Sequence, residues 1–87
     1  MTIQEQARFC VATYLRNEIK KETGKNPKRF EDSEIFIVWF CKTLQNWKAL
    51  VGTTVMEDVY FEVTYNGDKN EVYLDVYEKL QNIVIPG

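Results

Sequence analysis

The chain of 87 residues has no histidine and only two cysteines, Cys10 and Cys41, which stand far apart without a CxxC motif. Zinc sites and cysteine nucleophiles both depend on cysteine and histidine side chains in suitable spacing. We therefore expect no metal site, no cofactor and no enzymatic activity. The two thiols are expected to be small buried hydrophobic groups in a reducing compartment.

A long apolar run is also missing. The N-terminal sequence MTIQEQARFC lacks the basic start and the unbroken apolar stretch of a signal peptide. No segment approaches the roughly 20 apolar residues that a membrane span requires. These absences predict a soluble cytoplasmic protein with no membrane partner.

The charges are unevenly distributed, although the net charge of −2 is close to zero. Six bases and two acids lie between Arg16 and Arg29, whereas seven acids and one base lie between Glu57 and Glu78. We expect a molecule with one basic and one acidic end. A basic helix end is usually a solvated surface that suits the helix dipole, and the small net charge creates no general field for nucleic acid. We therefore do not expect a nucleic-acid partner.

The first third of the chain carries the signals of a helix. Thr2-Ile3-Gln4-Glu5 fits a capping box, and Gly24 suits the left-handed position after a helix end. Between them, apolar residues recur at helical spacing and form one stripe: Ile3, Ala7, Cys10, Val11, Tyr14 and Leu15. The sequence predicts a helix over residues 3–22, followed by a basic connector over residues 24–31.

The rest of the chain has the pattern of an antiparallel sheet over residues 35–79. Its first segment, IFIVWFC (35–41), is apolar on both faces, which is typical of a central strand covered on both sides. The helix would be one cover, and the C-terminal segment or a second copy would be the other. A second strand is expected over residues 47–53, and Asn66-Gly67 marks a hairpin between the third and fourth strands.

Residues 80–87 could form a further edge strand or a tail, because Pro86 ends any ladder. A chain of this length supports one core. We predict an α+β protein with a single domain over residues 1–87, in which one N-terminal helix packs on an antiparallel sheet of four to five strands.

The register of the last hairpin decides what its polar face presents. A strict two-residue turn would place Glu62 opposite Glu71, and like charges in that position are unfavourable. A four-residue loop, Asn66 to Lys69, would instead place Val63 opposite Val72. On the other face it would pair Glu62 with Tyr73, Tyr60 with Asp75 and Asp58 with Tyr77, each a phenol donor beside a carboxylate acceptor. We predict the longer loop.

This tyrosine and carboxylate face has two interpretations: it is an ordinary solvated sheet face, or it is a surface that binds a partner. Trp39 and Trp47 are expected in the core or at its edge, but Trp47 stands beside the predicted turn and becomes an interface anchor if it is exposed. On the second interpretation the carboxylates select a protein partner with a basic surface. The predicted partner-binding residues are Tyr60, Glu62, Tyr73, Asp75, Tyr77 and Trp47.

Two stretches carry a resemblance to a known group: VWFCKTLQNWKAL (38–50) and YNGDKNEVYLDVY (65–77). With them, the chain resembles a family of short uncharacterised proteins encoded by bacteriophages and prophages of Gram-positive bacteria. The resemblance implies a protein that acts in the host cytoplasm by binding, such as an inhibitor of a host defence factor. It implies no particular activity.

The leading hypothesis is thus a non-enzymatic accessory protein that binds and modulates a host factor. One alternative is a purely structural homodimer. The other is a homo-oligomer that sequesters a small nucleotide signal in an intersubunit cleft, where Lys42 and Lys48 would neutralise phosphates and aromatic rings would stack on the base.

Overall fold

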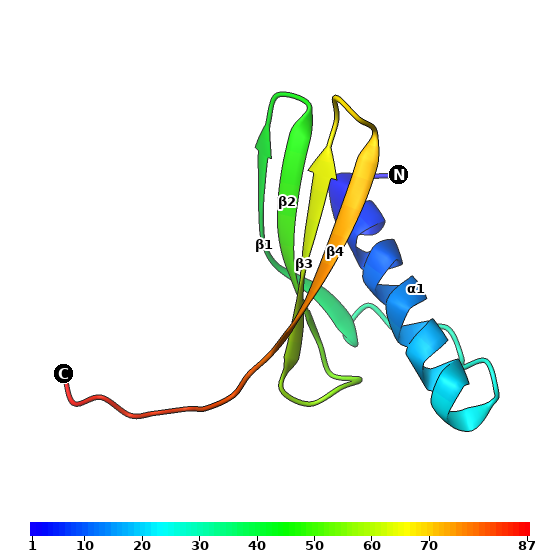
Figure 1. Ribbon diagram of the computed structural model, residues 1–87, viewed down its shortest axis with the longest axis vertical. Helices are drawn as coiled ribbons and strands as arrows, with labels where there is room; N and C mark the ends of the chain where they lie inside the picture. Colours follow the sequence, from blue (N-terminus) through cyan, green and yellow to red (C-terminus); the bar gives the residue numbers. More distant parts are fainter.

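A computed structural model describes residues 1–87 as one helix followed by a four-stranded sheet (Figure 1). The elements are α1 (Ile3–Thr23), β1 (Ile35–Thr43), β2 (Asn46–Thr53), β3 (Val59–Asn66) and β4 (Glu71–Glu78). The helix packs against one face of the sheet, and all strand pairs are antiparallel. The predicted α+β architecture is confirmed, with four strands rather than five.

The ends of α1 follow from its local sequence. The Thr2 hydroxyl accepts a hydrogen bond from the Glu5 amide at 3.1 Å, and the Glu5 carboxylate accepts one from the Thr2 amide at 3.4 Å. At the other end Gly24 has φ of 74°, and its amide donates to the Lys20 carbonyl at 2.7 Å. The helix is too polar to cross a membrane.

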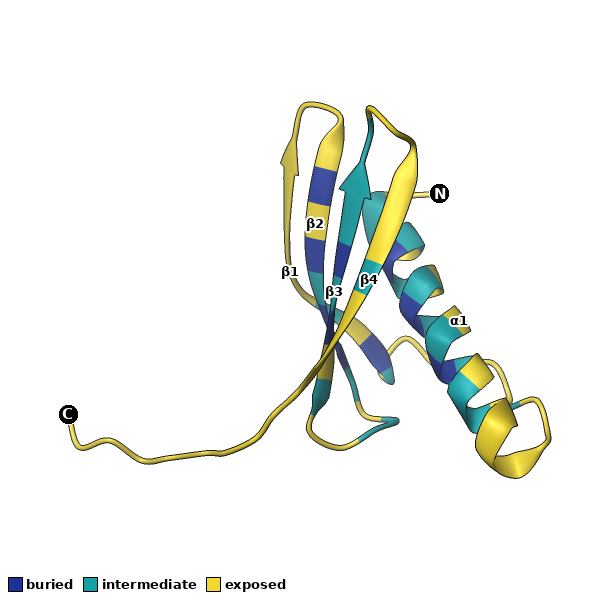
Figure 2. Cartoon of the chain, viewed as in Figure 1, coloured by how far each residue is buried: buried dark blue, intermediate teal, exposed yellow.

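The core is formed where α1 crosses the middle of the sheet. Along the helix, the stripe of Ala7, Val11 and Leu15 is fully buried. It packs with buried residues of β1, β2 and β3, which are Ile35, Trp47, Ala49, Val51, Phe61 and Val63. Figure 2 shows that burial is concentrated in α1 and the central strands, whereas most of β1 and β4 is exposed. The two edge strands therefore contribute little to the core.

Strand order corrects the prediction for the apolar first strand. The order is β1-β2-β3-β4, so β1 is an edge strand that pairs only with β2. The prediction that this apolar strand is central in the sheet is therefore wrong. The C-terminal segment (residues 79–87) does not cover it either, because this segment forms no strand and runs away from α1, past the end of the sheet (Figure 1).

A β-bulge in β1 sets which residues face outward. Ile37 pairs with Val51, but Trp39 pairs with Leu50, so Val38 is the extra residue. Without the bulge, Trp39 would continue the inward face of Ile35 and Ile37 because strand residues alternate. The extra residue reverses this alternation and turns Trp39 to the face opposite α1.

The register of the last hairpin differs from the predicted one by two residues. The loop is Gly67 to Asn70, and Asn66 pairs with Glu71. The Asn66 side chain accepts hydrogen bonds from the amides of Asp68 and Lys69, and Asn70 takes a left-handed conformation with φ of 52°. Asparagine tolerates that conformation well, so Asn70 belongs to the loop and the pairing begins one residue later on each strand.

The corrected register keeps the predicted faces but changes every partner. Val63 lies opposite Leu74, not Val72, and Tyr60 lies opposite Tyr77, not Asp75. The remaining predicted pairs are also wrong: Glu62 lies opposite Asp75 and not Tyr73, and Tyr77 lies opposite Tyr60 and not Asp58.

Candidate functional site

The sheet face turned away from α1, here called the outer face, carries three rows of side chains across all four strands. Each row is defined by Cα partners along β1, β2, β3 and β4 in that order. The first row is Cys41, Lys48, Thr64 and Tyr73; the second is Trp39, Leu50, Glu62 and Asp75; the third is Phe36, Gly52, Tyr60 and Tyr77. No other element of the chain covers these rows, and most of the residues in them are exposed.

Aromatic side chains dominate the third row. The rings of Tyr60 and Tyr77 are stacked, with centroids 5.1 Å apart and an angle of 12° between their planes. Phe36 lies over Gly52: a Cβ added to this glycine would come within 2.7 Å of Phe36 Cζ. Because Gly52 has no side chain, the Phe36 ring from β1 lies close to the sheet over β2. It continues the row of aromatic rings that Tyr60 and Tyr77 form on β3 and β4.

The second row brings two carboxylates together. Glu62 and Asp75 are direct cross-strand partners, a position in which like charges repel. Lys48 from the neighbouring row offsets this repulsion because its Nζ lies 3.0 Å from Glu62 Oε1. The hydrogen bond to Glu62 is the main reason that the pKa of Lys48 is raised. Asp75 has no such cationic partner.

The carboxylates also act on the tyrosines. The negative charge of Glu62 is the largest cause that raises the pKa of Tyr77 above its ordinary value. The Tyr73 hydroxyl donates a hydrogen bond to the Glu71 carboxylate, which raises the pKa of Tyr73. The raised pKa values widen the pH range over which both phenols are neutral, and Tyr73 is a hydrogen-bond donor to Glu71.

Five of the six predicted partner-binding residues share the outer face: Tyr60, Glu62, Tyr73, Asp75 and Tyr77. The exception is Trp47, which is only 6% exposed and stacks on Tyr65 in the face that packs on α1. It is a core residue and cannot be an exposed anchor. Trp39, which we expected in the core or at its edge, is 53% exposed on the outer face.

The two lysines of the alternative ligand site lie on opposite faces of the sheet. Lys48 belongs to the outer face, whereas Lys42 pairs with Trp47 and so belongs to the face of α1. They do not meet within one chain. Lys48 does line a hollow of about 380 Å³ on the outer face, with Trp39, Cys41 and Tyr73 among the residues around it.

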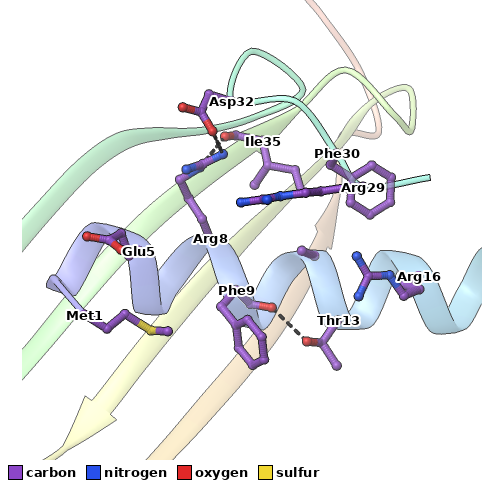
Figure 3. A pocket seen from close by; sticks show the side chains of 11 residues that line it. Met1, Glu5, Arg8, Phe9, Thr13, Arg16, Arg29, Phe30, Asp32 and Ile35 are labelled. Atoms are coloured by element: carbon purple, nitrogen blue, oxygen red, sulfur yellow. Dashed lines mark hydrogen bonds and ion pairs between the residues drawn. The ribbon is translucent and has the colours of Figure 1, made fainter. Parts of the chain in front are cut away.

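A second hollow, of about 450 Å³, lies between α1 and the connector before β1 (Figure 3). Arg8 points from the helix toward the connector, where its guanidinium donates to the Ile35 carbonyl at 2.9 Å and to Asp32 at 2.6 Å. This pairing fastens the start of β1 to the helix. Arg16 and Arg29 also line the hollow, and they bring part of the basic end of the molecule together.

The cysteines do not behave alike. Cys10 is half-buried against the core, and burial raises the pKa of its thiol. Cys41 is exposed on the outer face, so the prediction of two buried thiols is wrong for this residue. Histidine, cysteine and acidic side chains nowhere form a group of three that could hold a metal ion.

Comparisons with known proteins give a family but no function. Neither the curated proteins nor the solved structures contain a match to this chain. A family model matches residues 4–87, which is nearly the whole chain. The chain therefore belongs to DUF6275, a family of unknown function.

Proposed function

We propose that this chain is a non-enzymatic binding protein that docks a protein partner on its outer face. The observation that carries the proposal is the uncovered set of three rows, in which aromatic rings surround a pair of opposed carboxylates. Large exposed apolar side chains that gather on one face mark an interaction site, and this face exposes five aromatic rings, those of Phe36, Trp39, Tyr60, Tyr73 and Tyr77.

The residue types support a protein interface. Tyrosine and tryptophan are enriched at interfaces because they offer a large contact area and lose few rotatable bonds when they are ordered. Here the Tyr60–Tyr77 stack and the sheet backbone already fix the rings in place. A preorganised surface loses less entropy on binding, so more of the contact energy appears as affinity.

The charges support a basic partner. Glu62 and Asp75 face each other, and the single ammonium group of Lys48 contacts only Glu62. An arginine or lysine from a partner that reaches Asp75 would relieve the repulsion between the two carboxylates. Phosphate groups would be repelled from Asp75, which has no cationic partner.

The partner's origin is proposed from the sequence resemblance to phage and prophage proteins. On that basis the partner is a host protein in the cytoplasm, and the chain is an accessory protein that inhibits a host defence factor. The outer face would act by covering a basic surface of that factor, without chemistry of its own.

A comparison of three tagged baits in host lysate tests the proposal. The baits are the wild type, the double variant Tyr73→Ala/Asp75→Ala, and a matched control, Phe9→Ala/Glu22→Ala. The control removes one exposed ring and one exposed carboxylate from α1, outside the outer face. We expect at least one protein to be retained by the wild type and the control but lost from the double variant. Identical retained proteins for all three baits would contradict the proposal.

A second candidate function is capture of a small nucleotide, which the outer-face hollow favours. Trp39 and Tyr73 could stack on a base, and Lys48 at the same hollow could contact a phosphate. In a homo-oligomer this hollow would be half of an intersubunit cleft. A thermal-shift panel of cyclic and linear nucleotides tests it: one nucleotide should stabilise the wild type but not Trp39→Ala. The absence of any stabilising nucleotide would exclude this candidate.

A further inference from the structure

We propose that the C-terminal segment of one chain adds as a strand to the free edge of β1 in a second copy, and that two chains exchange these segments reciprocally. The inference does not rest on the proposed function, because the β1 edge and the outer face are different surfaces. It rests on the exposed segment, the apolar edge of β1 and the large accessible surface of the single chain.

The C-terminal segment is apolar but packs on nothing. Four of its side chains are between 68% and 88% exposed: Leu80, Ile83, Val84 and Ile85. Its sequence LQNIVI is rich in β-branched residues and is followed by Pro86, which ends a strand. Figure 2 shows the segment exposed along its whole length. The match to the family model includes this segment.

The β1 edge is suited to receive a strand. Natural sheets protect their edges with charged residues, proline, β-bulges or very short strands, whereas an apolar edge is a template for pairing with another chain. The bulge at Val38 is the one such device between Ile35 and Cys41. From Ile35 to Cys41, β1 contains neither a charged residue nor a proline. The opposite edge, β4, carries Glu71, Asp75 and Glu78. Of the two edges, β1 is therefore the one that accepts an apolar strand.

The segment cannot complete its own sheet in this way. It leaves from β4, and β1 lies at the opposite edge. To pair outside β1 it would have to cross four interstrand spacings, about 19 Å in total. Six extended residues span roughly 20 Å, so the crossing would use all of Leu80 to Ile85 and leave none to pair. A second copy can present its β1 to the entire segment.

The surface area agrees with a dimer. The chain exposes 6727 Å², whereas a folded monomer of 10.3 kDa typically exposes about 5,400 Å². The excess of roughly 1,300 Å² is larger than the about 800 Å² that each partner contributes to a standard interface. Reciprocal exchange uses the same two surfaces on both chains and therefore closes with twofold symmetry.

Sedimentation equilibrium of three variants across the micromolar range tests the proposal. We expect the wild type to have twice the 10.3 kDa mass of one chain. Ending the chain after Lys79, or introducing Val38→Lys at the exposed bulge of the edge, should raise the dissociation constant roughly a hundredfold or more, as the loss of interface anchors does. Asn17→Lys, which adds the same charge on exposed α1, should leave the dimer intact.

Mixing the two defective chains gives the sharpest result. The truncated chain keeps a free edge, and Val38→Lys keeps a C-terminal segment, so the mixture retains one of the two exchanged strands. It should form a one-to-one complex that is weaker than the wild-type dimer but tighter than the complex that either chain forms with itself. A wild type that is monomeric throughout, a truncated chain that remains dimeric, or a mixture that associates no more tightly than its separate chains would each overturn the proposal. Circular dichroism of each variant checks that the fold is retained.

Discussion

Replacing Gly67 with alanine should destabilise the fold through the contact between the two hairpins. Gly67 opens the β3–β4 loop and lies against the β1–β2 turn. A Cβ at this position would lie 2.5 Å from Gln45 Cβ and closer still to the Gln45 carbonyl oxygen. The backbone of Gly67 is not in the left-handed region, so alanine meets a steric obstacle and not a conformational one.

The magnitude follows from two effects. Overpacking of this kind costs about 1–3 kcal/mol, and it is not relieved cheaply because the obstructing atoms include backbone. Moving the loop also weakens the hydrogen bond from the Gly67 amide to Asn46 Oδ1, which is 2.8 Å long and contributes roughly 0.5–1.5 kcal/mol. A total near 3 kcal/mol would lower Tm by roughly 12–24 °C in a domain of this size.

Thermal and urea unfolding, followed by circular dichroism, measure this loss. Gly87→Ala is the matched control and should leave Tm unchanged, because nothing lies within 4 Å of its new Cβ. Adding Gln45→Gly to the Gly67 variant should recover only part of the loss, since the carbonyl contact persists. A Tm decrease of less than about 4 °C for Gly67→Ala would refute the reasoning.

Three further predictions concern the turn, the outer face and the thiols. Leu44 has φ of 55° in the β1–β2 turn, so Leu44→Gly should raise the free energy of unfolding by about 0.5–1 kcal/mol, measured by the urea midpoint; no increase would contradict this. Because the charge of Glu62 raises the pKa of Tyr77, the stability that the neutral phenol provides is present below pH about 10 and lost as pH rises through the raised pKa. Glu62→Gln should therefore move the tyrosinate absorbance titration to lower pH, and an unchanged titration would argue against the coupling. A limiting amount of iodoacetamide should alkylate exposed Cys41 before half-buried Cys10, which peptide mass spectrometry resolves.

The helix could be predicted from sequence because its signals are local. The capping box at Thr2 to Glu5, the apolar stripe and Gly24 act within one or two turns, and each lies where it was expected. The predicted range 3–22 differs from the observed Ile3–Thr23 by one residue. The strand segments and the presence of a hairpin near Asn66-Gly67 could be recognised for the same reason.

The register of the sheet could not be derived in this way, because it depends on contacts between hairpins. Avoiding opposed carboxylates was the argument for the predicted loop, yet Glu62 and Asp75 are opposed. Lys48, which offsets the repulsion between these carboxylates, comes from β2. The pattern of the β3–β4 hairpin alone therefore could not indicate it. The loop itself is shaped by contact with Gln45, which is also far from Gly67 in sequence.

Which residues lie on the outer face could be predicted only for β3 and β4, and not for β1. The tyrosines and carboxylates of β3 and β4 were assigned to one face correctly because alternation is local. The edge position of β1 was not predicted, nor was the bulge at Val38 that turns Trp39 to that face. Trp47 was the predicted anchor because it stands close to the exposed turn residue Gln45. Its position in β2 turns its side chain toward α1, which buries it.

Acrylamide quenching of Trp39 tests most directly whether the outer face is the docking surface. The variant Trp47→Phe keeps an aromatic ring in the core and leaves Trp39 as the only tryptophan. Free protein should show strong quenching, as expected for a side chain that is 53% exposed. When a protein retained by the wild-type bait is added in excess, quenching should fall several-fold and the emission should shift to shorter wavelength. Unchanged quenching of Trp39 in the bound state would place the partner elsewhere and contradict the account.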